Sequence, residues 1–257
     1  GDEAASLPVA PEAVSGTAVL SLGLDVALKA PGDGRPRVDY HGTGTLRDVA
    51  TAALIPNRPV TAQALDVDLS AAQVQIAGGV EIKGVPADIT WQRALTPGTT
   101  RSQVSFTAPL TREALGSFGL TLNAGEMQGA GRVTGDVVLD KGQPPRLSLD
   151  ADLTGATLRL AGLGWRNSAE QGGTLHLEGN LGAVPSFDVL TVDAPGLQAR
   201  GRLRLAASGG LARLDFDRLQ IGRWLRARLA LSPARGGKMA VDLGTGQVDL
   251  RALPKGG

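Results

Sequence analysis

Four aspartates stand in two pairs whose spacing could support chemistry. Asp66 and Asp68, and again Asp150 and Asp152, are separated by a single residue. On an extended strand, residues i and i+2 face the same side about 7 Å apart. Each pair could therefore supply oxygen ligands to Ca²⁺ or act as an acid/base pair. The sequence lacks the remaining ligands of a calcium loop, which favours a solvated outer face beside apolar neighbours.

The two histidines, His41 and His176, offer little for metal binding or general-base catalysis. His176 alternates with Leu175 and Leu177, so we expect it to face water beside Glu178. The sequence contains no cysteine, which excludes thiol chemistry and Cys-based metal sites. A phosphate loop, a dinucleotide fingerprint and a nucleophile elbow are also absent. The sequence predicts a protein that is not an enzyme and holds neither a metal nor a cofactor.

The composition excludes further classes of function. The 257 residues include 26 basic and 25 acidic side chains, a net charge of +1, which leaves no electrostatic footprint for nucleic acid. Four Phe, three Trp and one Tyr are too few for a base-stacking platform. No apolar run approaches the about 20 residues of a membrane span. The 36 glycines and 15 prolines, with 42% hydrophobic residues, are typical of many short strands joined by tight turns.

Two groups of side chains leave alternatives open. Trp91, Trp165 and Trp224 could line the mouth of a groove or contact lipid headgroups, but such residues more often plug a core or an edge. Arginines concentrated near the C-terminus could attract anionic headgroups. They could also form a solvated face balanced by Asp215 and Asp217, which we favour. These arginines are Arg200, Arg202, Arg204, Arg213, Arg218, Arg223, Arg226 and Arg228.

Alternation of apolar and polar residues dominates the chain and predicts strands. One short helix is expected over 112–118, with Thr111 as its N-cap. Residues 223–229 could form a basic amphipathic helix, but Leu225, Ala227 and Leu229 alternate with arginines and favour a strand. The predicted strands cover 19–28, 38–46, 65–69, 74–76, 80–82, 89–91, 104–106, 133–139, 147–153, 158–160, 175–177, 203–205, 214–216, 224–231 and 239–243.

An internal repeat indicates stacked units. Residues 65–78 and 149–162 match without gaps, and seven of the fourteen positions are identical. Each copy predicts a strand, a turn of small residues and a second strand, and such units stack on their neighbours. We expect residues 1–15 to form an extension or linker. Residues 16–257 then form one elongated domain with units near 60–145 and 146–257.

Alternating strands bury only one face, and one short helix cannot cover a long sheet. A closed sandwich or a solenoid would fill its own core, and would act in the periplasm as a scaffold or partner-binding module. A long antiparallel twisted sheet curled into an open hydrophobic groove, with one or two short helices, would need a ligand such as an acyl chain. Periodicity alone leaves both architectures open and slightly favours the sandwich.

Three short motifs carry a resemblance to a known family. They are residues 84–91 (Gly-Val-Pro-Ala leading to Trp91), residues 150–156 followed by Leu163-Gly164-Trp165, and residues 194–201. In their order and spacing, residues from about Gly16 to Pro254 resemble the AsmA-like superfamily, in particular its YhdP-type β-groove region. One departure is Arg166-Asn167, where the family often has Lys-Pro.

The resemblance implies a mainly β protein with an open groove that conducts phospholipid toward the outer membrane of a Gram-negative envelope. It implies a periplasmic location, other envelope proteins as partners, and a tether to the inner membrane through a helix that is not in this chain. The resemblance implies no catalytic residues in this chain. The expected lining of the groove is Leu20, Leu22, Leu24, Leu65, Val67, Leu69, Val74, Ile76, Ile82, Leu149, Leu153, Leu158, Leu160, Leu203, Leu205, Leu225, Leu229 and Leu231.

Overall fold

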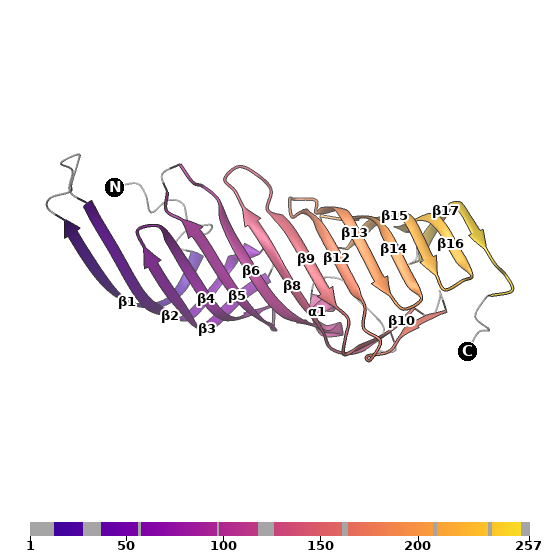
Figure 1. Ribbon diagram of the computed structural model, residues 1–257, viewed down its shortest axis with the longest axis horizontal. Helices are drawn as coiled ribbons and strands as arrows, with labels where there is room; N and C mark the ends of the chain where they lie inside the picture. Colours follow the sequence, from indigo (N-terminus) through magenta and orange to yellow (C-terminus); the bar gives the residue numbers. More distant parts are fainter. Residues whose placement is uncertain are drawn as a thin grey trace. The chain divides into compact units, whose positions relative to one another are not determined.

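The computed structural model describes residues 13–27, 37–55, 58–96, 98–117, 126–160, 164–207, 210–235 and 238–252. Most of these residues lie in strands, which are labelled in Figure 1. Fourteen strands form one antiparallel sheet in the order β1-β2-β3-β4-β5-β6-β8-β9-β12-β13-β14-β15-β16-β17. Three short strands form a second sheet in the order β11-β10-β7. The predicted mainly β fold, built on a long and unclosed antiparallel sheet, is confirmed, and the closed sandwich is wrong.

The strands begin and end as follows. Those of the large sheet are β1 (Val14–Ala27), β2 (Arg37–Ile55), β3 (Arg58–Ser70), β4 (Gln73–Ile82), β5 (Val85–Ala94), β6 (Ser102–Leu110), β8 (Gly131–Leu139), β9 (Arg146–Asp152), β12 (Thr174–Asn180), β13 (Ser186–Ala194), β14 (Leu197–Leu205), β15 (Leu211–Ile221), β16 (Leu225–Pro233) and β17 (Met239–Val248). Those of the small sheet are β7 (Met127–Gly129), β10 (Ala156–Leu160) and β11 (Trp165–Asn167).

The chain divides into two compact units. Unit 1 comprises residues 1–106 with 138–143, and unit 2 comprises 107–137 with 144–257. In unit 1, strands β1 to β5 follow one another as antiparallel neighbours. Its buried apolar side chains include Val60, Leu65, Val80 and Trp91. Unit 2 contains strands β9 to β17 and a core cluster at one end of its sheet.

The predicted short helix is present. The helix α1 covers Arg112–Ser117, and the hydroxyl of Thr111 accepts a hydrogen bond from the backbone N–H of Ala114 at 3.1 Å. This is the N-cap contact that satisfies a free donor of the first turn. Phe118, the last residue of the expected helix, lies outside the described residues.

Several predicted strands are longer or differently joined. The segments 74–76 and 80–82 belong to one strand, β4, and β2 continues beyond residue 46 to Ile55. Residues 224–231 fall largely in strand β16, so the choice of a strand over a helix was right. Strands β7, β11 and β13 were not predicted. Leu28, the end of the first predicted strand, and residues 1–12 of the expected extension lie outside the described residues.

The two copies of the repeat fold differently after their turns. In the first copy, β4 pairs with the preceding strand β3 as a hairpin. In the second copy, β10 leaves β9 and pairs instead with β7 and β11. The turn explains the difference, because Gly155 takes the position of Ala71 and has φ +90. A residue with a side chain rarely adopts this left-handed conformation, so the glycine lets the chain turn toward a second sheet.

Candidate functional site

The apolar residues of unit 2 form rows that run across seven strands, β9 and β12 to β17. Each row is a chain of directly paired residues on neighbouring strands. The first row is Leu149, Leu177, Leu190, Gly201, Phe216, Leu229 and Leu243. The second row is Leu147, Gly179, Phe187, Leu203, Leu214, Leu231 and Val241. The third row is Ala151, Leu175, Val192, Ala199, Leu219, Ala227 and Gly246.

Bulges keep these residues on one face of the sheet. In β15, the register shifts between Phe216 and Leu219, and a regular strand would have sent Leu219 to the opposite face. The extra residue restores the alternation, so Phe216, Leu219 and Ile221 share a face. Similar shifts occur between Phe187 and Leu190 of β13 and, opposite Ala227 and Leu229, between Leu243 and Gly246 of β17. Sequence alternation alone cannot place such shifts.

One end of this face is a filled core. A fourth row of Ala194, Leu197, Ile221 and Leu225 clusters with Trp165, and the third row contributes Ala199, Leu219 and Ala227. Leu158 and Leu160 of the small sheet pack against this cluster. The indole N–H of Trp165 donates a hydrogen bond to the carbonyl of Pro195 at 2.9 Å. Ile221 is only 2% exposed, so the small sheet closes this end of the face.

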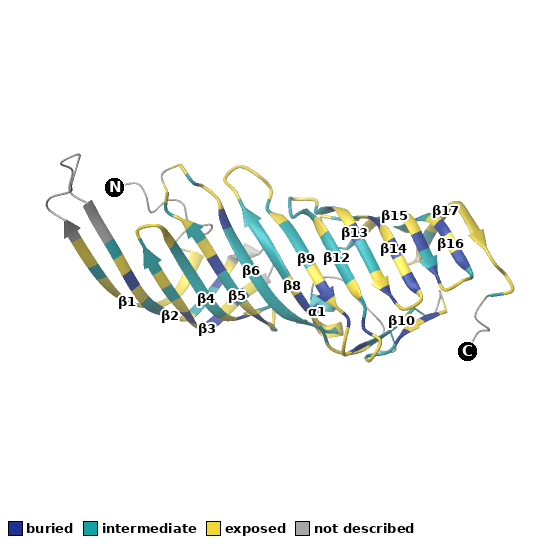
Figure 2. Cartoon of the chain, viewed as in Figure 1, coloured by how far each residue is buried: buried dark blue, intermediate teal, exposed yellow. Residues whose placement is uncertain are grey.

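The first and second rows are buried on β13, where Phe187 is 4% and Leu190 is 8% exposed, and are less covered on the last strands. Leu203, Leu214 and Leu231 are half-buried, and the exposed fractions rise to 58% for Val241 and 61% for Leu243 on the last strand. Figure 2 shows buried and exposed residues alternating along β14 and β16, as expected for a sheet with one apolar face. We call the first and second rows of unit 2 the apolar strip. An apolar surface of this kind, left open to water, commonly marks a binding surface.

Unit 1 presents a similar face at its first strand. Leu20 pairs with Gly44, and Leu22 pairs with Gly42. A Cβ atom at either glycine would collide with the paired leucine side chain, so the leucines lie across the glycines. Their exposed fractions are 55% for Leu20 and 67% for Leu22.

The structure places most of the expected lining residues on these two faces, and three elsewhere. In unit 1, register puts Leu20, Leu22, Leu24, Leu65, Val67, Leu69, Val74, Ile76 and Ile82 on one face. In unit 2, Leu149, Leu203, Leu205, Leu225, Leu229 and Leu231 share the face of the rows. Leu153 is 4% exposed, and Leu158 and Leu160 lie in the small sheet. These three, like Leu225 of the filled core, belong to filled packing rather than to the strip.

Several residues of the strip were missed by sequence reasoning. Phe187 and Leu190 lie in β13, which was not predicted as a strand. A register shift between them breaks their alternation, which removes the signal on which the prediction relied. Leu177, Leu214 and Phe216 were placed in strands but not assigned to the lining.

The candidate acidic pairs lie on the opposite, polar face. Asp66 and Asp68 are exposed and pair with Thr45 and Thr43 of β2. Asp152 accepts a hydrogen bond from the backbone N–H of Thr154 at 2.9 Å, and this bond lowers the pKa of the Asp152 carboxyl. The geometry fits a solvated outer face.

His176 is held between two carboxylates. Its Nδ1 lies 2.8 Å from Oδ1 of Asp150, and its Nε2 lies 3.1 Å from Oε1 of Glu178. The hydrogen bond to Asp150 is the main cause that raises the pKa of His176, partial burial opposes it, and Glu178 adds to the rise. His41 lies 3.8 Å from Asp25. Within the described ranges, no group of three or more His, Cys, Asp or Glu residues is arranged to hold a metal ion.

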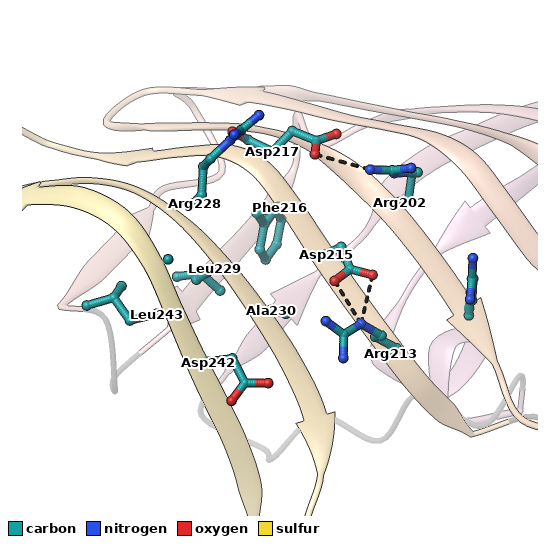
Figure 3. Close-up of a pocket in the computed structure, with 12 residues that line it drawn as sticks. Arg202, Arg213, Asp215, Phe216, Asp217, Arg228, Leu229, Ala230, Asp242 and Leu243 are labelled. Atoms are coloured by element: carbon teal, nitrogen blue, oxygen red, sulfur yellow. Dashed lines mark hydrogen bonds and ion pairs between the residues drawn. The ribbon is translucent and has the colours of Figure 1, made fainter.

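The polar face also carries a hollow of about 550 Å³ over strands β14 to β17 (Figure 3). Four arginines and three aspartates line it, together with apolar and small residues. These are Arg202, Arg204, Arg213, Arg228, Asp215, Asp217, Asp242, Phe216, Leu229, Ala230, Leu243 and Gly244. The hollow therefore combines charged side chains with members of the first apolar row.

Among the described residues, no helix is long and apolar enough to cross a membrane. Comparison with protein-family models, with curated proteins and with solved structures finds no match to this chain.

Proposed function

We propose that the apolar face of the sheet binds phospholipid acyl chains and conducts them passively between the inner and outer membranes. The observation that carries this proposal is the apolar strip of unit 2. Two uninterrupted rows of Leu, Val, Phe and Gly cross seven strands without a charged residue. The small sheet packs against the third and fourth rows, whereas the strip, apart from the buried Phe187, Leu190 and Gly201, is half-buried or exposed.

The dimensions of the strip suit an acyl chain. Seven strands at a spacing of about 4.8 Å extend about 29 Å. One leaflet of a bilayer has an apolar thickness of about 15 Å, half of the about 30 Å hydrocarbon core. A single acyl chain could therefore lie along either row with room to move. Burial of its surface would stabilise the complex by about 25 cal/mol per Å².

The chemistry of the strip favours low specificity. Its side chains offer no hydrogen-bond donor or acceptor that would read one particular lipid. Binding energy then changes little as the chain moves from one strand to the next, because each position presents similar aliphatic groups. The headgroup would stay in water, where its charge remains solvated.

The cellular setting follows from the family resemblance. On that basis the protein would act in the periplasm, tethered through a segment outside this chain, with other envelope proteins as partners. A scaffold without lipid is the competing interpretation, and it predicts that the strip binds no acyl chain.

Lipid content tests the proposal directly. The chain is purified from a Gram-negative host, and bound lipid is measured by native mass spectrometry and by extraction. We expect bound phospholipid, and we expect Leu231→Asp to lower it at least fivefold because a charge then interrupts the second row. Ser232→Asp is the matched control, since Ser232 follows on the same strand and faces the other side.

Circular dichroism must first show that both variants keep the β fold. A wild-type chain without lipid, or equal lipid in the two folded variants, would overturn the proposal and favour the scaffold.

A further inference from the structure

The hollow contains like charges placed directly opposite one another, because Arg204 of β14 pairs with Arg213 of β15. Outside the hollow, Arg200 pairs with Arg218 on the same two strands. Like charges in directly opposite positions of an antiparallel pair repel and destabilise the sheet. The repulsion falls when an anion lies between the two guanidinium groups.

The aspartates compensate this charge only in part. Asp215 accepts two hydrogen bonds from Nε of Arg213, at 2.8 and 3.0 Å. Asp217 accepts one from Arg202 at 3.3 Å. The lining of the hollow contains four arginines and three aspartates, so its net charge is positive. Figure 3 shows both ion pairs, Arg202 of β14 with Asp217 of β15 and Arg213 with Asp215 within β15.

Arg228 of β16 adds a further guanidinium to the lining of the hollow, beside Asp217 (Figure 3). Its Nε donates to the backbone carbonyl of Asp217 at 3.2 Å, and that carbonyl lies where the register of β15 shifts. The acceptor is neutral, so the contact orients the guanidinium without cancelling its charge. A guanidinium has five N–H donors in a planar fork, and this contact uses one of them.

Two small residues belong to the lining of the hollow. Ala230 is 8% exposed, and Gly244 lies against Arg228. Small side chains between long arginines leave room for a group the size of phosphate. Arginine is the residue best suited to phosphate, because its fork forms paired hydrogen bonds with two oxygens.

We propose that this hollow is a binding site for a phosphate ester, with Arg204, Arg213 and Arg228 as its ligands. The arginines and aspartates of the site lie on the face opposite the side chains of the apolar strip, and Phe216, Leu229 and Leu243 of the strip also line the hollow. The phosphate could belong to a lipid headgroup at a membrane surface or to a soluble ester.

The experiment uses the full chain and two probes. Soluble glycerol phosphate is titrated while thermal stability is followed, and vesicles of phosphatidylcholine with or without phosphatidylglycerol are tested by co-sedimentation. We expect binding of at least one phosphate ester that weakens as salt is added. Vesicle binding that requires phosphatidylglycerol identifies a lipid headgroup, and binding of glycerol phosphate alone identifies a soluble ester. Either result supports the site if the variants below remove it.

Two variants and a control tie the binding to the hollow. Arg204→Gln and Arg228→Gln should each weaken binding about tenfold or more, and Arg204→Lys should recover only part of it because lysine lacks the fork. Arg146→Gln removes an exposed arginine of β9, outside the hollow, and should leave binding unchanged.

Without ligand, Arg204→Gln should also be at least as stable as the wild type, because it relieves the repulsion from Arg213. Failure of both probes to bind, or equal loss in the Arg146→Gln control, would overturn the proposal. Lipid co-purification through the apolar strip is a separate measurement, so the two proposals can fail independently.

Discussion

His176 on β12 and Asp150 on β9 are directly paired across the large sheet, and their side chains meet at 2.8 Å. The contact joins neighbouring strands on the polar face of the sheet. The adjacent pair, Leu177 and Leu149, belongs to the first row on the apolar face. Glu178 binds the other ring nitrogen at 3.1 Å. In its protonated form the ring donates hydrogen bonds from both nitrogens, so the arrangement favours the imidazolium.

The first prediction concerns pH. The pKa of His176 is raised in the folded protein, so its contribution to stability is fully present below the unfolded pKa of about 6.5. The contribution is lost as the pH rises through the folded value. Because the side chain is 34% exposed and its partners are more exposed, we expect less than about 1 kcal/mol.

Urea unfolding at a series of pH values measures this effect. His176→Gln should remove the loss of stability that sets in as the pH rises above about 6.5, whereas His41→Gln is the control on β2. An unchanged pH profile in His176→Gln would contradict the assigned contact.

The second prediction tests the turn that sends β10 to the small sheet. Gly155→Ala should destabilise the protein by about 1–3 kcal/mol, because φ is +90 and the added Cβ would meet the carbonyl of Ala130. Gly210→Ala has open space around its Cβ and should change stability by less than about 0.5 kcal/mol. Thermal unfolding compares the two, and equal effects would show that the turn is not strained by a side chain.

The third prediction tests the filled end of the apolar face. Trp165 is 6% exposed and belongs to the core cluster, where the small sheet packs on the large one. Trp165→Ala should cost about 3–5 kcal/mol, and Trp165→Phe should cost less because more of the contact area remains. Denaturant unfolding gives both values. A cost below about 1 kcal/mol for the alanine variant would argue against this packing.

The fourth prediction separates a core residue from a half-buried residue on the same face as the strip. Leu153 is 4% exposed, so Leu153→Asp buries a charge and should unfold unit 2 or lower its stability by several kcal/mol. Leu205 is half-buried at the end of β14, so Leu205→Asp should fold and lose bound lipid. Circular dichroism and lipid extraction distinguish the two effects. A stable Leu153→Asp variant would contradict its assignment to the core.

The fold class followed from local patterns. Alternation along residues such as Leu203 and Leu205 indicates a strand with one apolar face, whatever the strand pairs with. The helix could also be predicted from local sequence, because the Thr111 cap contacts the backbone within the first helical turn. The polar face positions of Asp66, Asp68 and His176 could be read in the same way, since they alternate with apolar neighbours.

The candidate site was harder to predict. Register shifts near Leu190 and Leu219 depend on pairing with a neighbouring strand, and a short sequence window carries little trace of them. The positions of Leu158 and Leu160 in a second sheet depend on where β7 and β11 lie. The cross-strand pairing of Arg204 with Arg213 likewise arises only from the register of β14 and β15.

The sequence by itself determined that this protein is a mainly β chain with one apolar face, because side-chain direction in a strand alternates with a fixed period of two. Only the tertiary structure decided which part of that face is covered. Coverage depends on contacts between segments far apart in the chain, such as Trp165 with Leu197 and Ile221. The energy of these contacts comes from burying surface that no single segment can bury alone.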